Sequence, residues 1–340
     1  MWYTIVIVLD IFLAWFITNS LIALFQYLFP SLPYALPVLV LQQFHIPAGF
    51  VTLVTYFPNA MLVGLYFMYR PSRSAAFCHW QGWNYMRKTH FSYRVYSCGP
   101  GGPAGPALIE RTNYESWPDW PHLHNQVVYA VAPHAIYAES VTFFFTLNKL
   151  FERVTTIATS LMFWIPIVRE VISLAGVVAA TTANIAHELD SGHSIVMLPE
   201  GIRAVLHINE SNGVMRVLRG QTQGENEPRK GFIRCVMACA KDVLIVPVYN
   251  AGAEKTYTTY NIFPWLQRRM LRNYMYPWPT FSFGYFYSFC PKKTQINVCL
   301  GQPIHCKGKT VDQVHEEFCV AMEHLIAVSK QITLSHGFIQ

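Results

Sequence analysis

A histidine and a glutamate lie five residues apart directly after an apolar run. His134 follows Val127–Ala132, whose β-branched composition predicts a strand, and Glu139 comes in the predicted helix that begins near Ile136. Ligand sites of open α/β sheets collect at the carboxyl ends of strands. A first helical turn can bring the Glu139 carboxylate back to the imidazole, so that one ring nitrogen is held and the other is a general base. The alternative is a structural histidine at a strand end.

A second turn carries a carboxylate and a guanidinium. Glu200, Gly201 and Arg203 follow the apolar run Ser194–Leu198. The charged side chains and backbone N–H groups of such a turn can bind hydroxyl or phosphate groups of a substrate. An ordinary turn with a surface ion pair is the alternative.

A third motif places two cations at a predicted helix start. Arg229 and Lys230 precede Gly231, and a helix is expected over Lys230–Lys241. Helix N-termini favour anions, so the motif suits the phosphates of coenzyme A. A solvent-exposed helix start is the alternative.

Short β-branched runs alternate with helical patterns from Gln126 onward. Strands are expected at Val127–Ala132, Val154–Ala158, Gly176–Ala180, Ser194–Leu198, Val243–Tyr249 and Ile296–Leu300, and helices at Ile136–Leu150, Leu161–Ile172, Thr182–Asp190, Lys230–Lys241 and Val311–Lys330. This alternation predicts an α/β fold with a mixed central sheet flanked by helices over residues 126–340. Residues 70–125 are expected to be an irregular linker, or alternatively a loop that lies on the domain, because Cys98–Pro106 is a Gly/Pro-rich run that predicts a loop.

The few charges of the chain are unevenly distributed. Charged residues make up 13% of the chain, about half the usual share, and residues 1–69 contain only one, Asp10. We predict a membrane hairpin over 1–69, with arms near Ile11–Phe29 and Phe50–Tyr69, the second of which either spans or re-enters. The basic residues that follow it favour a cytosol-facing domain. The chain lacks the dense Lys/Arg footprint of a nucleic-acid binder, so no nucleic-acid partner is expected.

Together, these motifs resemble the diacylglycerol acyltransferase type 2 family, which includes monoacylglycerol and wax-ester acyltransferases. The resemblance covers about residues 126–330 and the hairpin, and the motifs that carry it stand in the family's order: Pro133-His134, the Glu200 turn, Arg229-Lys230-Gly231-Phe232, Pro247-Val248-Tyr249 with Gly252, and Gly301-Gln302-Pro303-Ile304. The family usually has His-Pro-His-Gly, whereas Ala132 and Ala135 take the places of the first His and the Gly. The spacing of His134 and Glu139 and the Leu-Pro-Glu-Gly-Ile-Arg turn are similar to motifs of glycerophospholipid acyltransferases.

The resemblance implies acyl transfer from an acyl-CoA, as co-substrate rather than bound cofactor, to the hydroxyl of a membrane lipid, diacylglycerol first of all. The expected roles are general base for His134, its orientation for Glu139, substrate binding for Pro133, Glu200, Gly201 and Arg203, and coenzyme A binding for Arg229, Lys230 and Gly231. No metal is expected. The implied location is the endoplasmic reticulum membrane, with lipid droplets as a second location.

Several alternatives stay open from the sequence. The acceptor is alternatively a lysophosphatidate or other lysophospholipid, with Arg203 on its phosphate, or a monoacylglycerol or wax alcohol. A non-catalytic membrane lipid-binding protein is a further alternative, motivated by the altered His-Pro-His-Gly motif. The aromatic stretch Tyr274–Phe289 suits either a membrane interface or the core. Acyl-chain preference and association of identical chains are not decided.

Overall fold

The computed structural model describes residues 71–102, 105–165, 167–207, 212–221, 227–239, 242–274, 280–287 and 290–335. The chain divides into the units Met1–Arg70 and Pro71–Gln340. The predicted membrane hairpin over residues 1–69 lies outside the described residues. Within the described ranges, no helix combines the length and the apolar character needed to cross a membrane.

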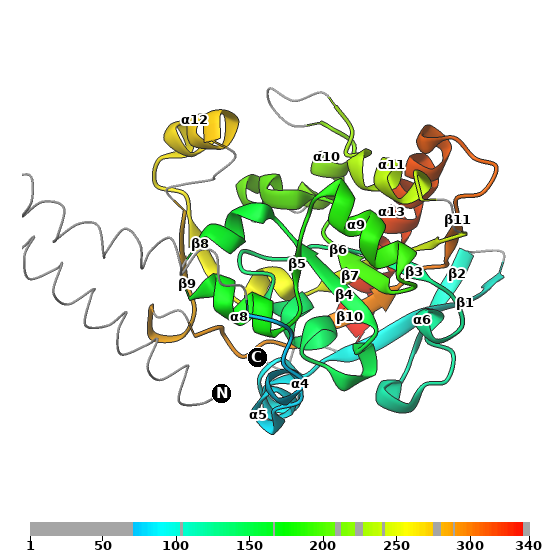
Figure 1. Ribbon diagram of the computed structural model, residues 1–340, viewed down its shortest axis with the longest axis horizontal. Coiled ribbons are helices and arrows are strands. Elements are labelled where there is room, and N and C mark those ends of the chain that lie inside the picture. The colour runs from blue at the N-terminus through cyan, green and yellow to red at the C-terminus, as the bar shows by residue number, and fades with distance from the viewer. Residues whose placement is uncertain are drawn as a thin grey trace, which may run out of the picture. The chain divides into compact units, whose positions relative to one another are not determined.

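One large mixed sheet organises the unit Pro71–Gln340 (Figure 1). Its strand order is β2-β1-β10-β7-β3-β6-β4-β5, and β11 also pairs with β7. The strands are β1 (Arg94–Gly102), β2 (Gly105–Glu110), β3 (Val127–Ala132), β4 (Val154–Ala158), β5 (Val178–Ala179), β6 (Ser194–Met197), β7 (Leu244–Ala251), β10 (Asn297–Leu300) and β11 (Ile304–His305). The five strands from β7 to β5 are parallel, whereas β10 is antiparallel to β7 and β2 is antiparallel to β1. The predicted α/β fold with a mixed central sheet flanked by helices is confirmed.

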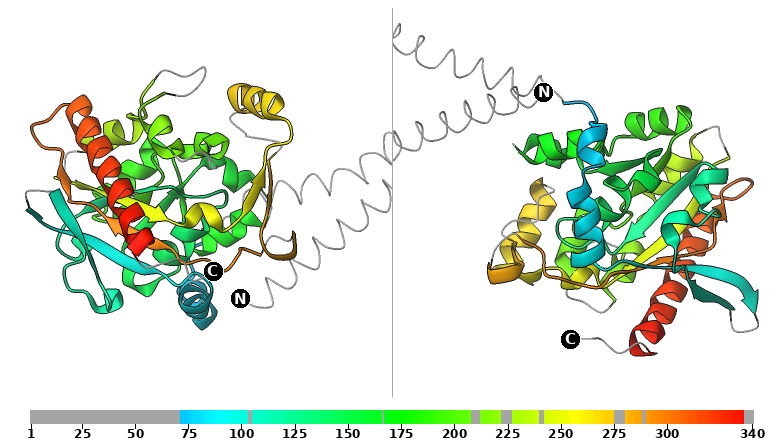
Figure 2. Two further views of the ribbon diagram at one scale, coloured as in Figure 1. Left: turned by 180° about the vertical axis from the view of Figure 1, so that it is seen from behind. Right: turned by 90° about the horizontal axis from the view of Figure 1, so that it is seen from below.

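Helices cover both faces of this sheet. The α-helices are α4 (Ala75–Cys78), α5 (Gln81–Tyr85), α6 (Pro121–His124), α7 (Glu139–Val141), α8 (Val168–Leu174), α9 (Thr182–Asp190), α10 (Gly213–Leu218), α11 (Gly231–Met237), α12 (Pro264–Tyr274) and α13 (Val311–Ser335). Short π-helical segments lie at Met86–His90 and Thr142–Thr146, and short 3₁₀-helical segments at Tyr114–Ser116, Lys149–Phe151, Ser160–Trp164, Gly201–His207, Ala253–Lys255 and Tyr285–Tyr287. Figure 2 shows α13 running along the sheet, which it contacts at β7.

The central strand β3 supplies both halves of the core. Alternate residues of a strand point to opposite faces. Val128 and Ala130 pack with α9, α11 and α13, whereas Tyr129 and Val131 pack with the aromatic residues Phe144 and Phe151. Strand β3 is buried along its whole length, and His134 and Ala135, which follow it closely, are buried as well.

Local sequence signals predicted some elements to the residue. Strands β3 and β4 and helix α9 have the predicted bounds. Thr181 caps α9 by accepting a hydrogen bond from the Asn184 amide, and Gly192, with φ of 82°, follows its end as expected.

The prediction of a single helix over Ile136–Leu150 is wrong. The chain forms α7, a wide turn over Thr142–Thr146 and a tight turn over Lys149–Phe151, and the Asn148 side chain accepts from the Leu150 amide at the last break. The helix expected over Leu161–Ile172 is divided as well, because the sequence places Pro166, which cannot donate a backbone hydrogen bond, inside it.

The loop expected over Cys98–Pro106 is also wrong. Its described residues, 98–102 and 105–106, form the ends of β1 and β2, and β1 pairs in parallel with β10, so these two strands extend the main sheet rather than a linker. The register shifts between Cys98 and Gly101, which leaves Pro100 at the irregularity. A proline at a bulge costs no ladder hydrogen bond, so the run of breakers is compatible with a strand.

Candidate active site

His134 lies two residues beyond β3 and is held by a backbone carbonyl. Its side chain is buried (6% exposed), and its Nε2 donates to the carbonyl oxygen of Gly201 at 3.1 Å. A carbonyl oxygen can only accept, so the hydrogen is on Nε2 and Nδ1 carries a lone pair. This Nδ1 is buried and has no hydrogen-bond partner among the described residues. Burial lowers the pKa of His134, which keeps the ring neutral and leaves Nδ1 as a base.

Glu139 starts α7 and is also buried, but it faces a different partner. Its Oε1 accepts from Oγ1 of Thr256, and its Oε2 has no partner among the described residues. Burial raises the pKa of Glu139 to about 7, against the opposing effect of the Thr256 hydrogen bond. A carboxyl group with this pKa exchanges its proton near neutral pH.

No hydrogen bond joins His134 to Glu139 in the part of the chain that the structure describes. The Gly201 carbonyl performs the orienting role that the sequence assigned to the carboxylate. Catalytic hydrogen bonds in substrate-free enzymes are often long or incomplete. The pairing of His134 with Glu139 therefore stays a prediction.

The turn after β6 supplies the Gly201 carbonyl and a second buried carboxyl group. Glu200 is 2% exposed and its Oε1 has no partner in the described ranges. Burial raises the pKa of Glu200 to about 8, so the group is mostly protonated at pH 7 and can donate a hydrogen bond. Gly201 has φ of 60°, a conformation that favours glycine. Half-buried Arg203 lies in the following turn, Gly201–His207.

The third motif reaches this turn through Arg229. A Cβ atom placed on Gly201 would lie 4.0 Å from Nη2 of Arg229. Lys230 instead forms an ion pair with Asp312 on α13, with 2.7 Å between Nζ and Oδ1. Gly231 begins α11, and a Cβ there would meet no atom within 4 Å. The structure therefore brings Arg229 to the His134 site and ties Lys230 to α13.

Sequence reasoning missed a polar residue of β7 at the same edge of the sheet. Because Tyr249 pairs with Ala132, Asn250 lies beside the start of the Pro133-His134 turn. Asn250 is fully buried, its Nδ2 donates to Oγ of Ser140 at 3.3 Å, and its Oδ1 has no partner in the described chain. The signal that could have found it is one amide side chain in the apolar strand Leu244–Ala251.

The site is marked by buried polar atoms without partners. They are Nδ1 of His134, Oε2 of Glu139, Oε1 of Glu200 and Oδ1 of Asn250, from segments that follow or end the neighbouring strands β3, β6 and β7. Each such atom costs about 1–3 kcal/mol when nothing satisfies it. Their concentration at the carboxyl ends of parallel strands is what a substrate site of this fold requires.

The match to a protein-family model covers this whole site. The family model described as "Diacylglycerol acyltransferase" matches residues 121–334, and so contains every residue named in this section. Diacylglycerol O-acyltransferase 1 of Saccharomyces cerevisiae is 24% identical over 179 residues, which cover 48% of this chain and 40% of that protein. The chain therefore spans less than half of the length of this curated relative. From the match to the family model, the chain belongs to the diacylglycerol acyltransferase family.

Proposed function

We propose that this chain transfers a fatty acyl group from an acyl-CoA to the hydroxyl of diacylglycerol, giving triacylglycerol, with His134 as general base. The observation that carries the proposal is the Gly201 carbonyl on Nε2 of His134, which leaves a buried, unpaired Nδ1 at the edge of the sheet. Family membership supports the acyl transfer. The narrower type 2 assignment rests on the order of the motifs.

In this mechanism, Nδ1 of His134 removes the hydroxyl proton while the hydroxyl oxygen attacks the thioester carbonyl carbon. The tetrahedral oxyanion then collapses and the carbon–sulfur bond breaks. The leaving coenzyme A sulfur takes the proton back from His134, so the enzyme returns to its starting state without an acyl-enzyme. The lowered pKa of His134 ensures that the ring begins neutral.

The remaining residues bind and orient the substrates in this proposal. Protonated Glu200 donates a hydrogen bond to a substrate oxygen, and Arg203 supports the acceptor beside it. Arg229 and Lys230 bind phosphates of coenzyme A, as cations beside a helix start can. Glu139 positions the turn that carries His134.

The proposed setting is the endoplasmic reticulum membrane, with the domain facing the cytosol. Diacylglycerol and triacylglycerol reside in the bilayer, so the enzyme must work at its surface. The charge-poor residues 1–69 support this setting, because a stretch with one acid and no cation is suited to a bilayer.

Activity assays with several acceptors test the proposal. Microsomes from cells that lack neutral-lipid synthesis would carry either the wild type or His134→Ala, and would receive labelled acyl-CoA with diacylglycerol, monoacylglycerol or lysophosphatidate. We expect labelled triacylglycerol from the wild type and a loss of about 10²–10⁴-fold in the variant. Triacylglycerol that persists in the variant would remove His134 from the role of base.

The same assay separates the alternatives. The turn that holds His134 also carries Arg203, which favours a phosphate-bearing acceptor as the second candidate. Product from lysophosphatidate alone would select that candidate. No product from any acceptor would indicate a lipid-binding protein without activity.

A further inference from the structure

Between β7 and β10 the chain leaves the main sheet and forms a separate excursion. Its described elements are β8 (Thr258–Tyr260), which pairs with β9 (Phe281–Phe283), and α12 (Pro264–Tyr274). Figure 1 shows α12 at the margin of the domain, away from the central sheet. The excursion starts and returns at Thr256, whose carbonyl accepts from the Lys292 amide at 2.8 Å. Thr256 also bonds Glu139, so the excursion is rooted at the candidate site.

The excursion holds an unusual charge. The sequence has no Asp or Glu between Glu254 and Asp312. Residues 255–293 contain the six cations Lys255, Arg268, Arg269, Arg272, Lys292 and Lys293. Their charge of +6 equals the formal net charge of the entire chain. This segment is therefore strongly basic, while the rest of the chain is close to neutral.

Helix α12 has a buried side and an outward side of distinct chemistry. Gln267 and Leu271 are buried, and Nε2 of Gln267 donates to Oγ1 of Thr280 at 2.5 Å. Trp265, Arg269 and Arg272 follow the i, i+4, i+7 spacing of one helix face, opposite to that buried side. Trp265 is 62% exposed and both arginines are exposed.

The residues before α12 add to this outward surface. Ile262 and Phe263 are exposed large apolar side chains directly before the helix. Arg268, on the helix itself, is also exposed. Among the described residues, no ion pair involves the three arginines of α12. Exposed aromatic and aliphatic side chains near arginines without an ion pair in the described chain are suited to a partner that has both anionic and apolar groups.

We propose that the exposed surface formed by Phe263 and by Trp265, Arg268, Arg269 and Arg272 of α12 docks on an anionic lipid bilayer. Trp265 and Phe263 enter the headgroup level, where aromatic rings concentrate, and Arg268, Arg269 and Arg272 contact lipid phosphates. A basic segment is attracted to an anionic leaflet, whereas a neutral leaflet offers it little. This contact is distinct from a hairpin in residues 1–69, because it belongs to the folded domain and depends on lipid charge. If the proposed function holds, it also keeps the root of the excursion, at Glu139, beside a lipid acceptor.

Amide exchange of the full chain tests this docking without any use of enzyme activity. The full-length protein would be reconstituted in vesicles of phosphatidylcholine alone, or with about 30% phosphatidylserine, and deuterium uptake would be followed for residues 264–274. We expect slower uptake in the phosphatidylserine vesicles, and loss of that difference in 0.5 M salt, because salt screens exposed charges. Residues 1–69 contain no Lys or Arg, so a difference that needs anionic lipid and is lost in salt points to the basic residues of the domain.

Two matched triple variants sharpen the test. Arg268→Gln/Arg269→Gln/Arg272→Gln is expected to abolish the lipid-dependent difference, since each cation near an anionic surface contributes about fivefold to binding. Lys149→Gln/Arg153→Gln/Lys307→Gln removes the same charge from exposed positions outside the excursion and is expected to retain it. Trp265→Ala is expected to reduce it.

Three results would overturn the proposal. The first is equal uptake in both vesicles. The second is an equal loss in both triple variants, which would indicate attraction by net charge alone. The third is protection that does not depend on lipid, which would assign the face to a protein contact.

Discussion

Two buried histidines of this domain each hydrogen-bond a backbone carbonyl through Nε2, but they differ in the surroundings of the second ring nitrogen, Nδ1. His134 donates from Nε2 to the Gly201 carbonyl at 3.1 Å, and His315 on α13 donates from Nε2 to the Leu218 carbonyl at 3.2 Å. Burial lowers the pKa of both rings. At His315, Sγ of Cys319 lies 3.8 Å from Nδ1 and 3.7 Å from Nε2, so the thiol contacts both ring nitrogens, whereas Nδ1 of His134 has no partner in the described residues. The unused nitrogen, rather than the buried histidine, marks the candidate site.

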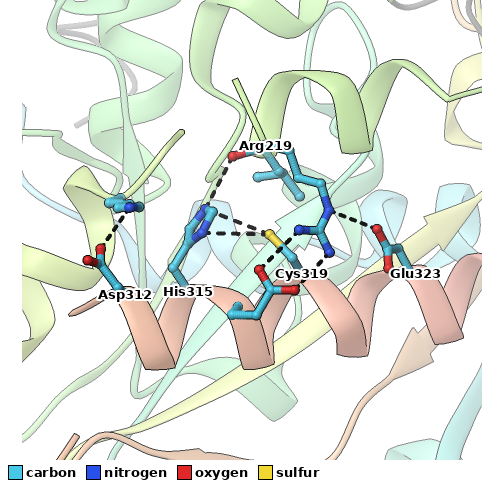
Figure 3. Close-up of polar contacts among 8 residues, drawn as sticks. Arg219, Asp312, His315, Cys319 and Glu323 are labelled. Atoms are coloured by element: carbon cyan, nitrogen blue, oxygen red, sulfur yellow. Dashed lines mark hydrogen bonds and ion pairs between the residues drawn. The ribbon is translucent and has the colours of Figure 1, made fainter. Parts of the chain in front are cut away.

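The surroundings of the two histidines differ in the same way. Around His315 the polar groups are paired: Arg219 binds Glu316 and Glu323 on α13, as Figure 3 shows. Burial raises the pKa of the Cys319 thiol to about 11, so it stays protonated. Around His134 the carboxyl groups Glu139 and Glu200 are buried, and neither forms an ion pair among the described residues. Paired polar groups stabilise a helix contact, whereas unpaired ones leave capacity for a substrate.

The largest expected effect comes from replacing each histidine with glutamine, whose amide can still donate to the carbonyl. His134→Gln is expected to reduce acyl transfer by about 10²–10⁴-fold, because the amide has no basic nitrogen. His315→Gln is expected to retain activity per folded molecule. Initial rates with labelled acyl-CoA measure both.

Thermal unfolding of the same two variants supplies the control. His315→Gln is expected to lower the midpoint, since a misfitted buried polar group costs about 1–3 kcal/mol, while His134→Gln changes it less. A folded His315→Gln protein without activity would contradict the purely structural role assigned to His315.

The second effect concerns stability against pH. The Glu200 carboxyl has a pKa of about 8 in the folded chain, against 4.5 as its ordinary value. Between these values the folded state holds more protons than the unfolded state, so the free energy of unfolding falls as pH rises, by about 3–5 kcal/mol up to pH 9. Glu139 adds to the same trend. The wild type should therefore melt at lower temperature at pH 9 than at pH 6, and Glu200→Gln should shrink that difference.

Glu316 on α13 gives the opposite case. Its exposed carboxylate is paired with Arg219, which lowers its pKa. Its contribution is present at neutral pH and lost as pH falls through the folded pKa. Glu316→Gln should leave the difference between pH 6 and pH 9 unchanged. An equal change in both variants would contradict the buried, uncharged state of Glu200.

A smaller effect separates two buried threonine hydroxyls of the excursion, Thr256 at its root and Thr259 in β8. Thr256→Val removes the hydroxyl that lowers the pKa of Glu139, so the acid limb of the pH–rate profile should shift to higher pH. Thr259→Val removes a buried hydroxyl bonded to Ser282 at 3.0 Å and should not shift it. Both variants should lose about 1–2 kcal/mol of stability. An unshifted profile in Thr256→Val would show that Glu139 does not titrate during turnover.

Local patterns predicted the central part of this fold, but not its long-range contacts. Strand β3 and helix α9 follow from side-chain periodicity and capping, which are encoded within a few residues. Strand β1 exists because β10, about 200 residues later in the sequence, pairs with it, and Gly/Pro content does not reveal such a partner. The broken segment 136–150 follows the buried packing of Phe144 and Phe145 rather than helix propensity.

The candidate site was predictable to the same degree. His134, Glu139 and Glu200 were found because charged side chains after apolar strands are conspicuous. The hydrogen-bond partners of His134 and Glu139 in the structure could not be predicted, because the Gly201 carbonyl is a backbone group that every residue has, and Thr256 lies 117 residues from Glu139. Burial that raises the pKa of two carboxyl groups is likewise a property of packing.

The smallest expected effect lies where the two regions meet, at the ion pair of Lys230 with Asp312. Nζ of Lys230 lies 2.7 Å from Oδ1 of Asp312, so this carboxylate of α13 competes with any anion that Lys230 would bind. Asp312→Asn is expected to lower the acyl-CoA concentration at half-maximal rate by less than about fivefold, because exposed pairs are weak. The direction of the change in this concentration tests the role of Lys230. A fall indicates that the freed Lys230 contacts a phosphate, and no change indicates that the ion pair does not affect acyl-CoA binding.

Helix α13 offers a matched control for this change. Lys309 and Glu317 form an ion pair of similar geometry, with 2.6 Å between Nζ and Oε2, but neither residue belongs to the Arg229-Lys230-Gly231 motif. Glu317→Gln should leave the acyl-CoA dependence unchanged, and Lys230→Gln should raise the half-maximal concentration. If Asp312→Asn and Lys230→Gln both weaken acyl-CoA use, then Lys230 serves to anchor α11 to α13. The structural ion pairs around His315 would then extend as far as Lys230, next to Arg229 of the candidate site.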